Sequence, residues 1–173
     1  MFMTQELCDL KTCIIEGRYD DALLIVDELE GMSKQDILRK IESFLVRLLI
    51  HLIKNQLEQR LTNSLAASIR GSLVEIKRLN LKDNKTSFYI NEDEWMTMLE
   101  DTIELAISDA SVEVFNGIYT PFQVDDMVDR NQTIAIASSL LALTYLHPKK
   151  DLAGVINEFL TQLPGGQDWL QGR

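Results

Sequence analysis

The sequence is poor in cysteine and histidine, with two of each among 173 residues. Two thiols make no disulfide framework in a chain of this length, and the spacing of Cys8 and Cys13 puts them on partly different faces of a helix. A zinc site usually needs more cysteine and histidine. Neither His51 nor His147 stands three residues after a glutamate, as a di-iron bundle would require. We therefore expect no metal and no cofactor.

Long apolar runs and a secretory leader are also missing. The longest apolar runs, 44–53 and 134–146, are interrupted by polar side chains or are too short to cross a bilayer. The first ten residues lack the basic and apolar regions of a signal peptide. Together with the scarcity of cysteine, these absences predict a soluble protein of the reducing cytoplasm that makes no contact with a membrane.

Catalytic motifs are absent as well. The glycines form neither a phosphate-binding loop nor a dinucleotide fingerprint, and no EF-hand spacing occurs. Serines such as Ser64 and Ser68 have no base that their spacing identifies. The acidic clusters at 92–94, 100–104 and 125–129 are typical of helix starts and solvated faces. No reaction is predicted, and we expect association rather than catalysis.

What the sequence does contain is helical periodicity. Apolar residues recur at intervals of three and four nearly everywhere, without strand-like alternation between turns. This pattern predicts an all-α fold, a compact bundle of about seven to eight helices with a long central helix. The helices are expected at about 5–16, 20–30, 33–61, 64–79, 91–116, 120–128, 131–146 and 151–163. We assign residues 1–146 to a single domain and 147–173 to a C-terminal helical extension and tail.

Individual residues predict where these helices end. Gly17 and Gly31 are expected to end the first two helices, and Ser33 with Asp36 to cap the third. Gly71 falls in the middle of the fourth helix, where glycine costs up to about 1 kcal/mol relative to alanine. A close crossing by another helix would explain it.

The net charge of −10 is unevenly distributed along the chain. Residues 33–79 carry nine basic and four acidic side chains, whereas the flanking segments are acidic. Lys40, Arg47 and Lys54 recur every seven residues and so fall on nearly one line of a helix. Either these cations pair with acidic neighbours within the fold, or they leave an open stripe for an acidic partner. The predicted binding residues are Lys40, Arg47, His51, Lys54, Asn55 and Arg70.

Several stretches together resemble a known family. They are GRYDDALLIVDELEGMS, then FLVRLLIHLIKNQLEQRLTNSLAASIRGSLVEI, then IYTPFQVDDMVDR. They resemble the domain of unknown function 29 family, uncharacterised bacterial proteins that are frequent in cyanobacteria. The similarity covers about Leu7 to Leu146, and a central pattern matches at His51, Leu52, Lys54, Ser64, Ile69 and Arg70. The resemblance implies an all-helical fold and no assigned activity.

We expect a small interaction or accessory module. It would associate with itself as a homo-oligomer, such as a dimer, or dock an acidic protein through the basic residues. The alternative is an enzyme or small-ligand binder with a pocket around His51, lined by Asn55, Glu58 and Arg70. Nucleic acid ranks last because the acidic net charge opposes binding to a phosphate backbone.

Overall fold

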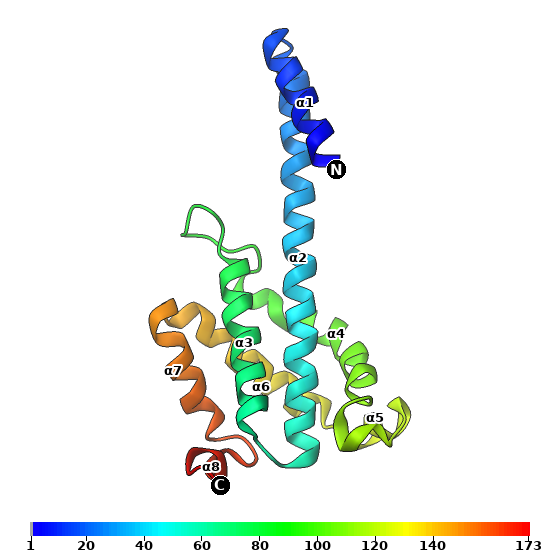
Figure 1. Ribbon diagram of the computed structural model, residues 1–173, viewed down its shortest axis with the longest axis vertical. Coiled ribbons are helices and arrows are strands. Elements are labelled where there is room, and N and C mark those ends of the chain that lie inside the picture. Colours follow the sequence, from blue (N-terminus) through cyan, green and yellow to red (C-terminus); the bar gives the residue numbers. More distant parts are fainter. Residues whose placement is uncertain (1) are drawn as a thin grey trace. The chain divides into compact units, whose positions relative to one another are not determined.

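The computed structural model describes the backbone of residues 2–173 and the side chains of residues 4–173. Within that part of the chain it contains eight α-helices, two 3-10 segments and no strand (Figure 1), which confirms the all-α prediction. The elements are α1 (Phe2–Ile15), α2 (Tyr19–Glu58), α3 (Asn63–Asn80), η1 (Glu92–Glu94), α4 (Trp95–Ala110), η2 (Val114–Gly117), α5 (Pro121–Met127), α6 (Arg130–Leu146), α7 (Lys149–Leu160) and α8 (Gly166–Leu170).

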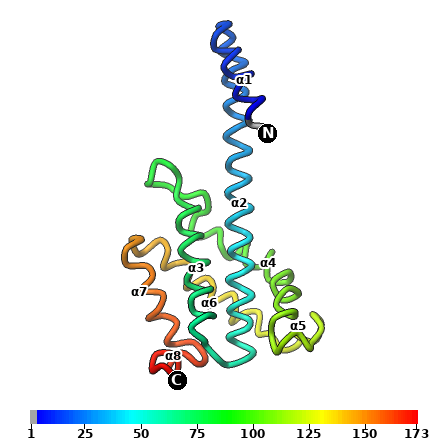
Figure 2. Tube along the Cα trace, viewed as in Figure 1, coloured from blue at the N-terminus to red at the C-terminus, as the bar shows by residue number. Residues whose placement is uncertain are grey.

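The chain divides into two compact units, Met1–Lys40 and Ile41–Arg173, and each is described by itself. The continuous helix α2 contributes its first half to the first unit and its second half to the second. The second unit also includes residues 147–173, which the sequence assigned to an extension. Figure 2 follows the trace from the blue N-terminus to the red C-terminus.

The predicted break at Gly31 is wrong, because α2 runs uninterrupted from Tyr19 to Glu58. A glycine inside a helix costs about 1 kcal/mol, whereas a helix end leaves up to four N–H and four C=O groups without helical partners. The neighbours of Gly31 are mostly strong helix formers, including Glu28, Leu29, Glu30 and Lys34. Continuing the helix therefore costs less than ending it, and Ser33 lies in mid-helix instead of capping a new one.

The first unit is an antiparallel hairpin of α1 and the start of α2 (Figure 1). Gly17, with a φ of +75°, ends α1 as predicted. The N–H of Gly17 donates to the carbonyl of Ile14 at 3.2 Å, and the N–H of Arg18 donates to the carbonyl of Cys13 at 2.8 Å. This is a Schellman turn, in which glycine adopts the left-handed conformation at little cost.

The second unit has a continuous apolar core. The second half of α2 buries Ile41, Leu45, Leu48, Leu49 and Ile53, so more than one stripe of this helix is covered, as predicted for the central helix. Helix α3 packs against α6 and α7, and buries Leu65, Ile69, Leu73 and Ile76, which are spaced three or four residues apart. Helix α4 packs against α5 and α6.

A buried polar network holds the connection between α3 and η1. The Asn80 side chain donates to the carbonyl of Ile90 at 2.9 Å and accepts from the Ile90 N–H at 2.7 Å. The Tyr145 hydroxyl donates to the same carbonyl at 2.5 Å and accepts from Trp95 Nε1 at 2.6 Å. These bonds satisfy the backbone groups of a loop whose end enters the core.

The predicted fifth helix overran its real end, since α4 stops at Ala110 rather than at Asn116. Phe115 and Asn116 adopt left-handed φ values of 48° and 60°. The Phe115 N–H donates to Glu58 Oε2 at 3.0 Å, a contact between residues 57 positions apart. A tertiary partner thus holds a backbone conformation that local periodicity did not indicate.

Candidate functional site

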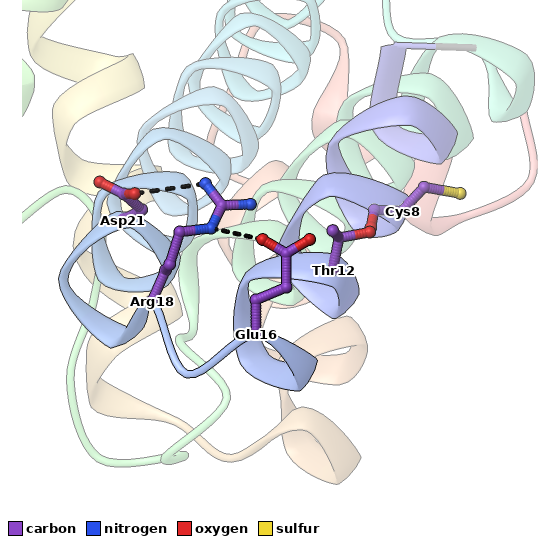
Figure 3. A network of polar contacts seen from close by, with 5 residues as sticks. All are labelled: Cys8, Thr12, Glu16, Arg18 and Asp21. Atoms are coloured by element: carbon purple, nitrogen blue, oxygen red, sulfur yellow. Dashed lines mark hydrogen bonds and ion pairs between the residues drawn. The ribbon is translucent and has the colours of Figure 1, made fainter.

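One face of the first unit is polar. Arg18 Nε lies 2.8 Å from Glu16 Oε2, and Arg18 Nη1 lies 3.4 Å from Asp21 Oδ2 (Figure 3). The Thr12 hydroxyl donates to the carbonyl of Cys8 at 3.0 Å. Asp9, Thr12, Arg18 and Asp21 line a shallow groove on this side, together with Cys13, Leu24 and Ile25. The polar groups on this face are hydrogen-bonded within the hairpin or open to solvent.

The opposite face of the hairpin is mainly apolar, as the helical geometry shows, with Glu6 and Glu30 as its acidic members. Cys13 on α1 and Ala22 on α2 are buried and mark the line where the two helices meet. At about 100° per residue, Leu7, Ile14 and Leu23 lie about 100–120° round from that line, and Tyr19 about 60°. Because right-handed helices that run antiparallel turn these positions to the same side, the four residues share one face, with Leu10 and Val26 between them. We call these six residues the hairpin face.

The hairpin face is largely exposed to solvent. Leu7 and Ile14 are each 52% exposed, Tyr19 is 65% exposed and Leu23 is 62% exposed. Only Cys13 and Ala22 are buried apolar residues among the described side chains of residues 4–40. The hairpin therefore covers little of its apolar surface by itself, and contiguous exposed apolar surface is typical of interaction sites.

Leu24 is a matched comparison for Leu23. It is 62% exposed, the same fraction as Leu23, but it lies about 200° round from the contact line, away from the hairpin face. Likewise on α1, Ile15 lies away from the hairpin face, whereas its neighbour Ile14 lies on it. Each of the two pairs therefore compares an exposed residue on the hairpin face with an exposed neighbour of the same type that lies off it.

A cavity lies beside His51 in the second unit. Its volume is about 500 Å³. Helix α2 contributes Phe44, Arg47, Ile50 and His51, and helix α3 contributes Ser68, Gly71, Ser72 and Glu75. Glu113, between α4 and η2, completes the lining. A β-carbon at Gly71 would meet nothing within 4 Å, so the predicted close helix crossing there is wrong and the glycine faces open space.

Burial lowers the pKa of His51, and this is the largest influence on the ring. Glu113 raises the pKa, whereas Lys54 and Arg47 lower it. The Nδ1 atom of His51 is buried and has no hydrogen-bond partner among the described residues. The imidazole is therefore favoured in its neutral form.

The structure places the other predicted binding residues in different surroundings. Asn55 is buried and donates to the carbonyls of Arg60 and Pro164 at 3.1 and 2.8 Å, so it holds the turn after α2. Arg70 Nη1 donates to Asn157 Oδ1 at 2.8 Å and links α3 to α7. Lys54 is half-buried, and Lys40 is exposed in the first unit. Only Arg47 and His51 of the predicted set line the His51 cavity.

Glu58, expected beside His51, accepts from the Phe115 N–H instead. It also lines a separate groove of about 850 Å³, which Arg60 and Trp169 line as well. Arg47 is exposed and its guanidinium lies 6.0 Å from the centre of the Phe44 ring, a cation–π distance. The predicted basic residues therefore have different surroundings, and the side chain of Arg47 stays exposed.

Sequence reasoning missed the hairpin face. Its signal was present in the spacing of Leu7 and Ile14, seven residues apart beside the stripe of Cys13. A helix with two adjacent apolar stripes has more apolar surface than one neighbouring helix can cover. The charge pattern predicted a contact surface within 33–79 instead. The sign of a charge can be read directly from the sequence, whereas the exposure of a leucine side chain depends on the fold.

Two features are missing from the part of the chain that the structure describes. No helix there combines the length and the apolar character needed to cross a bilayer. No group of three or more histidine, cysteine, aspartate or glutamate side chains gathers there in a way that could hold a metal ion.

The fold and its surfaces define a small all-helical protein that combines an apolar hairpin with a second, well-packed helical unit. Residues 19–132 match the family described as "Domain of unknown function DUF29", and the chain belongs to that family. The match begins with α2 and ends in the first turn of α6, so α1 lies outside it. No curated protein and no solved structure matches the chain.

Proposed function

We propose that the protein works as a protein–protein interaction module and that the hairpin face is its contact surface. The observation that supports this most strongly is that four exposed side chains, those of Leu7, Ile14, Tyr19 and Leu23, lie together on one side of the hairpin. Exposed large apolar side chains are usually scattered singly, whereas these are gathered on one side of a two-helix element. Burying them against a partner would gain roughly 25 cal/mol for each Å² of apolar surface removed from water.

The proposal replaces the basic stripe as the leading contact surface. Arg70 is bonded to Asn157, and Asn55 is bonded to backbone carbonyls, so both side chains are occupied by the fold. Lys40, Arg47 and Lys54 remain available to steer an acidic partner, an effect that acts mainly on the rate of association. We also propose a reducing cytoplasm as the compartment, since Cys8 is exposed and both cysteines are free thiols.

Site-specific photocrosslinking in the source cells tests the proposal. A p-benzoylphenylalanine replaces Leu23 in the full-length chain, and the matched control replaces Leu24, which is equally exposed. We expect a crosslinked protein product, identified by mass spectrometry, from position 23 and little from position 24. Equal products from the two positions, or none from position 23, would contradict an interaction through the hairpin face.

A second candidate function is the binding of a small carboxylate in the His51 cavity. The specific observation in its favour is a cavity of about 500 Å³ that has Arg47 and His51 among its lining residues. Pockets of roughly 300–1,000 Å³ suit small ligands. Arg47 has no ion pair among the described residues, and a guanidinium group is a natural partner for a carboxylate.

NMR of the two histidine rings tests this candidate, with acetate as the probe. The chain has only His51 and His147, so the ring signals can be assigned with one variant. We expect acetate to shift the His51 signal saturably and to leave His147 unchanged, and Arg47→Gln to weaken the effect. Parallel shifts of both rings, or no saturation at His51, would remove the candidate.

A further inference from the structure

The partner that best fits the hairpin face is a second copy of the same face. We propose that two chains pair through Leu7, Ile14, Tyr19 and Leu23, so that their two hairpins form a four-helix bundle with twofold symmetry. The inference rests on the proposed function, because it names the partner of that same surface. The geometry and the exposed area of the hairpin support this pairing, and its charge predicts how the pair responds to salt.

The geometry favours a closed pair. A twofold interface uses the same patch on both partners, so the patch must complement itself. The hairpin face has its apolar residues on both helices, and the opposite face carries the Glu16–Arg18–Asp21 ion pairs. Two such faces can bury each other while both polar faces stay in water. Since a self-complementary patch is used up when two copies meet, the pair closes and does not extend into a filament.

The exposed area matches the lower range of specific interfaces. Taking roughly 200 Å² as the full surface of a large apolar residue, four residues exposed by about half to two-thirds present on the order of 500 Å² per copy. Two copies would bury about 1,000 Å² of apolar surface in total, near the smallest area expected of a biological interface. Polar atoms at the rim would add to this area.

The hairpin also has too little core to be complete by itself. Helices of 14 residues depend on tertiary packing for most of their stability in water. Within residues 4–40 the buried apolar side chains are the small residues Cys13 and Ala22, whereas the larger ones are exposed or only partly buried. A second hairpin would supply the missing side of the core, which is the ordinary arrangement of a four-helix bundle.

Charge gives this interface a distinctive response to salt. Residues 1–40 carry five basic and nine acidic side chains, so two hairpins repel each other at long range. Salt screens that repulsion and leaves apolar burial largely unaffected, so added salt should tighten the pair. Docking of an acidic partner on the basic residues would respond in the opposite way.

Light scattering coupled to size-exclusion chromatography tests the inference on the full-length chain. We expect a dimer for the unmodified protein and for Leu24→Lys, and a monomer for Leu23→Lys. Twofold symmetry places two new charges in the apolar contact, so the dissociation constant should rise roughly tenfold or more. Ile14→Lys and Ile15→Lys form a second matched pair with the same expected contrast, and circular dichroism checks that each variant keeps its helix content.

The outcomes separate this inference from the proposed function. A monomer at every concentration and salt, or equal loss of the dimer in Leu23→Lys and Leu24→Lys, would overturn the self-pairing. If the purified chain is monomeric while position 23 crosslinks to a different protein in cells, the self-pairing fails and the proposed function stands. If position 23 crosslinks to nothing, the proposed function fails too.

Discussion

Burial decides the charge of His51. A half-buried imidazole loses hydration when it is protonated, so burial lowers its pKa below the ordinary value of 6.5. Lys54 and Arg47 act in the same direction, and Glu113 opposes them. Glu113 lies between α4 and η2, whereas His51 lies on α2. The pKa of His51 therefore depends on how these two parts of the cavity lining are placed.

The pH dependence of stability follows from that shift. Well above pH 6.5 both the folded and the unfolded ring are neutral, and His51 contributes nothing to the pH dependence. As the pH falls below 6.5, the unfolded ring protonates first, so we expect the free energy of unfolding to fall until the folded ring also titrates. Urea denaturation between pH 4.5 and 7.5 measures this, and His51→Gln should flatten that part of the curve. An unchanged slope in His51→Gln would contradict it.

The neighbours of His51 give a second test by NMR titration. The midpoint should lie below 6.5 in the unmodified chain, move lower still in Glu113→Gln and move up in Arg47→Gln. Shifts of the opposite sign would show that Glu113 and Arg47 do not face the ring as the cavity requires.

Tyr145 anchors the buried network around Ile90, and burial raises the pKa of its hydroxyl. Removing the hydroxyl in Tyr145→Phe leaves Trp95 Nε1 without its acceptor and the Ile90 carbonyl with one donor fewer. We expect a loss of about 1–3 kcal/mol in the free energy of unfolding. Urea denaturation measures it, and a change within error would mean that water replaces the hydroxyl without loss.

At the scale of elements, three glycines distinguish helix interiors from helix ends. Gly31 in α2 and Gly71 in α3 lie within helices, and a β-carbon at either would meet nothing within 4 Å. Gly17 lies between α1 and α2 with a φ of +75°, where a β-carbon is strained. The same substitution should therefore have opposite effects at these positions.

We expect Gly31→Ala and Gly71→Ala each to stabilise the protein by about 0.5–1 kcal/mol, and Gly17→Ala to destabilise it by about 1–2 kcal/mol. Gly154→Ala in α7 is the matched control for Gly71, because it too faces open space but lies outside the His51 cavity. Thermal unfolding by circular dichroism measures all four. A loss of stability in Gly31→Ala would mean that α2 bends or ends there.

The helix ends show which local signals can be read from sequence. The predicted helix starts at 91 and 120 are confirmed within one or two residues, because Asn91 with Glu94 forms a capping box before α4 and Thr120 with Pro121 opens α5, each within one helical turn. Gly31 misled because a single glycine is compatible with both a helix end and a helix interior. The left-handed residues after α4 were missed because the carboxylate that accepts from the Phe115 N–H, that of Glu58, is distant in sequence.

At the scale of the whole molecule, the sequence predicted the fold class well and the working surface less well. Helical periodicity follows from burial and therefore identifies helices reliably. The spacing of Leu7 and Ile14 indicates a second apolar stripe, but which of the two stripes stays uncovered depends on the neighbours that the fold supplies. Likewise, the sequence predicted Asn55 and Arg70 as binding residues, whereas in the fold they donate hydrogen bonds to Pro164 and Asn157.

The two explanations of association differ in the sign of their salt dependence. Pairing through the acidic hairpins should strengthen as salt screens their mutual repulsion, and docking through Arg47 and Lys54 should weaken. Arg47→Glu combined with Lys54→Glu should accordingly leave the dissociation constant of the dimer within about threefold of the unmodified value. A larger loss of affinity in analytical ultracentrifugation would assign the contact to the basic residues.

Sedimentation equilibrium of the unmodified full-length chain, at about 50 mM and about 500 mM NaCl, tests the pairing of the hairpin faces most directly. We expect a monomer–dimer equilibrium whose dissociation constant is lower at the higher salt concentration. A monomer at both salt concentrations, or a dimer that dissociates as salt is added, would contradict association through the hairpin face.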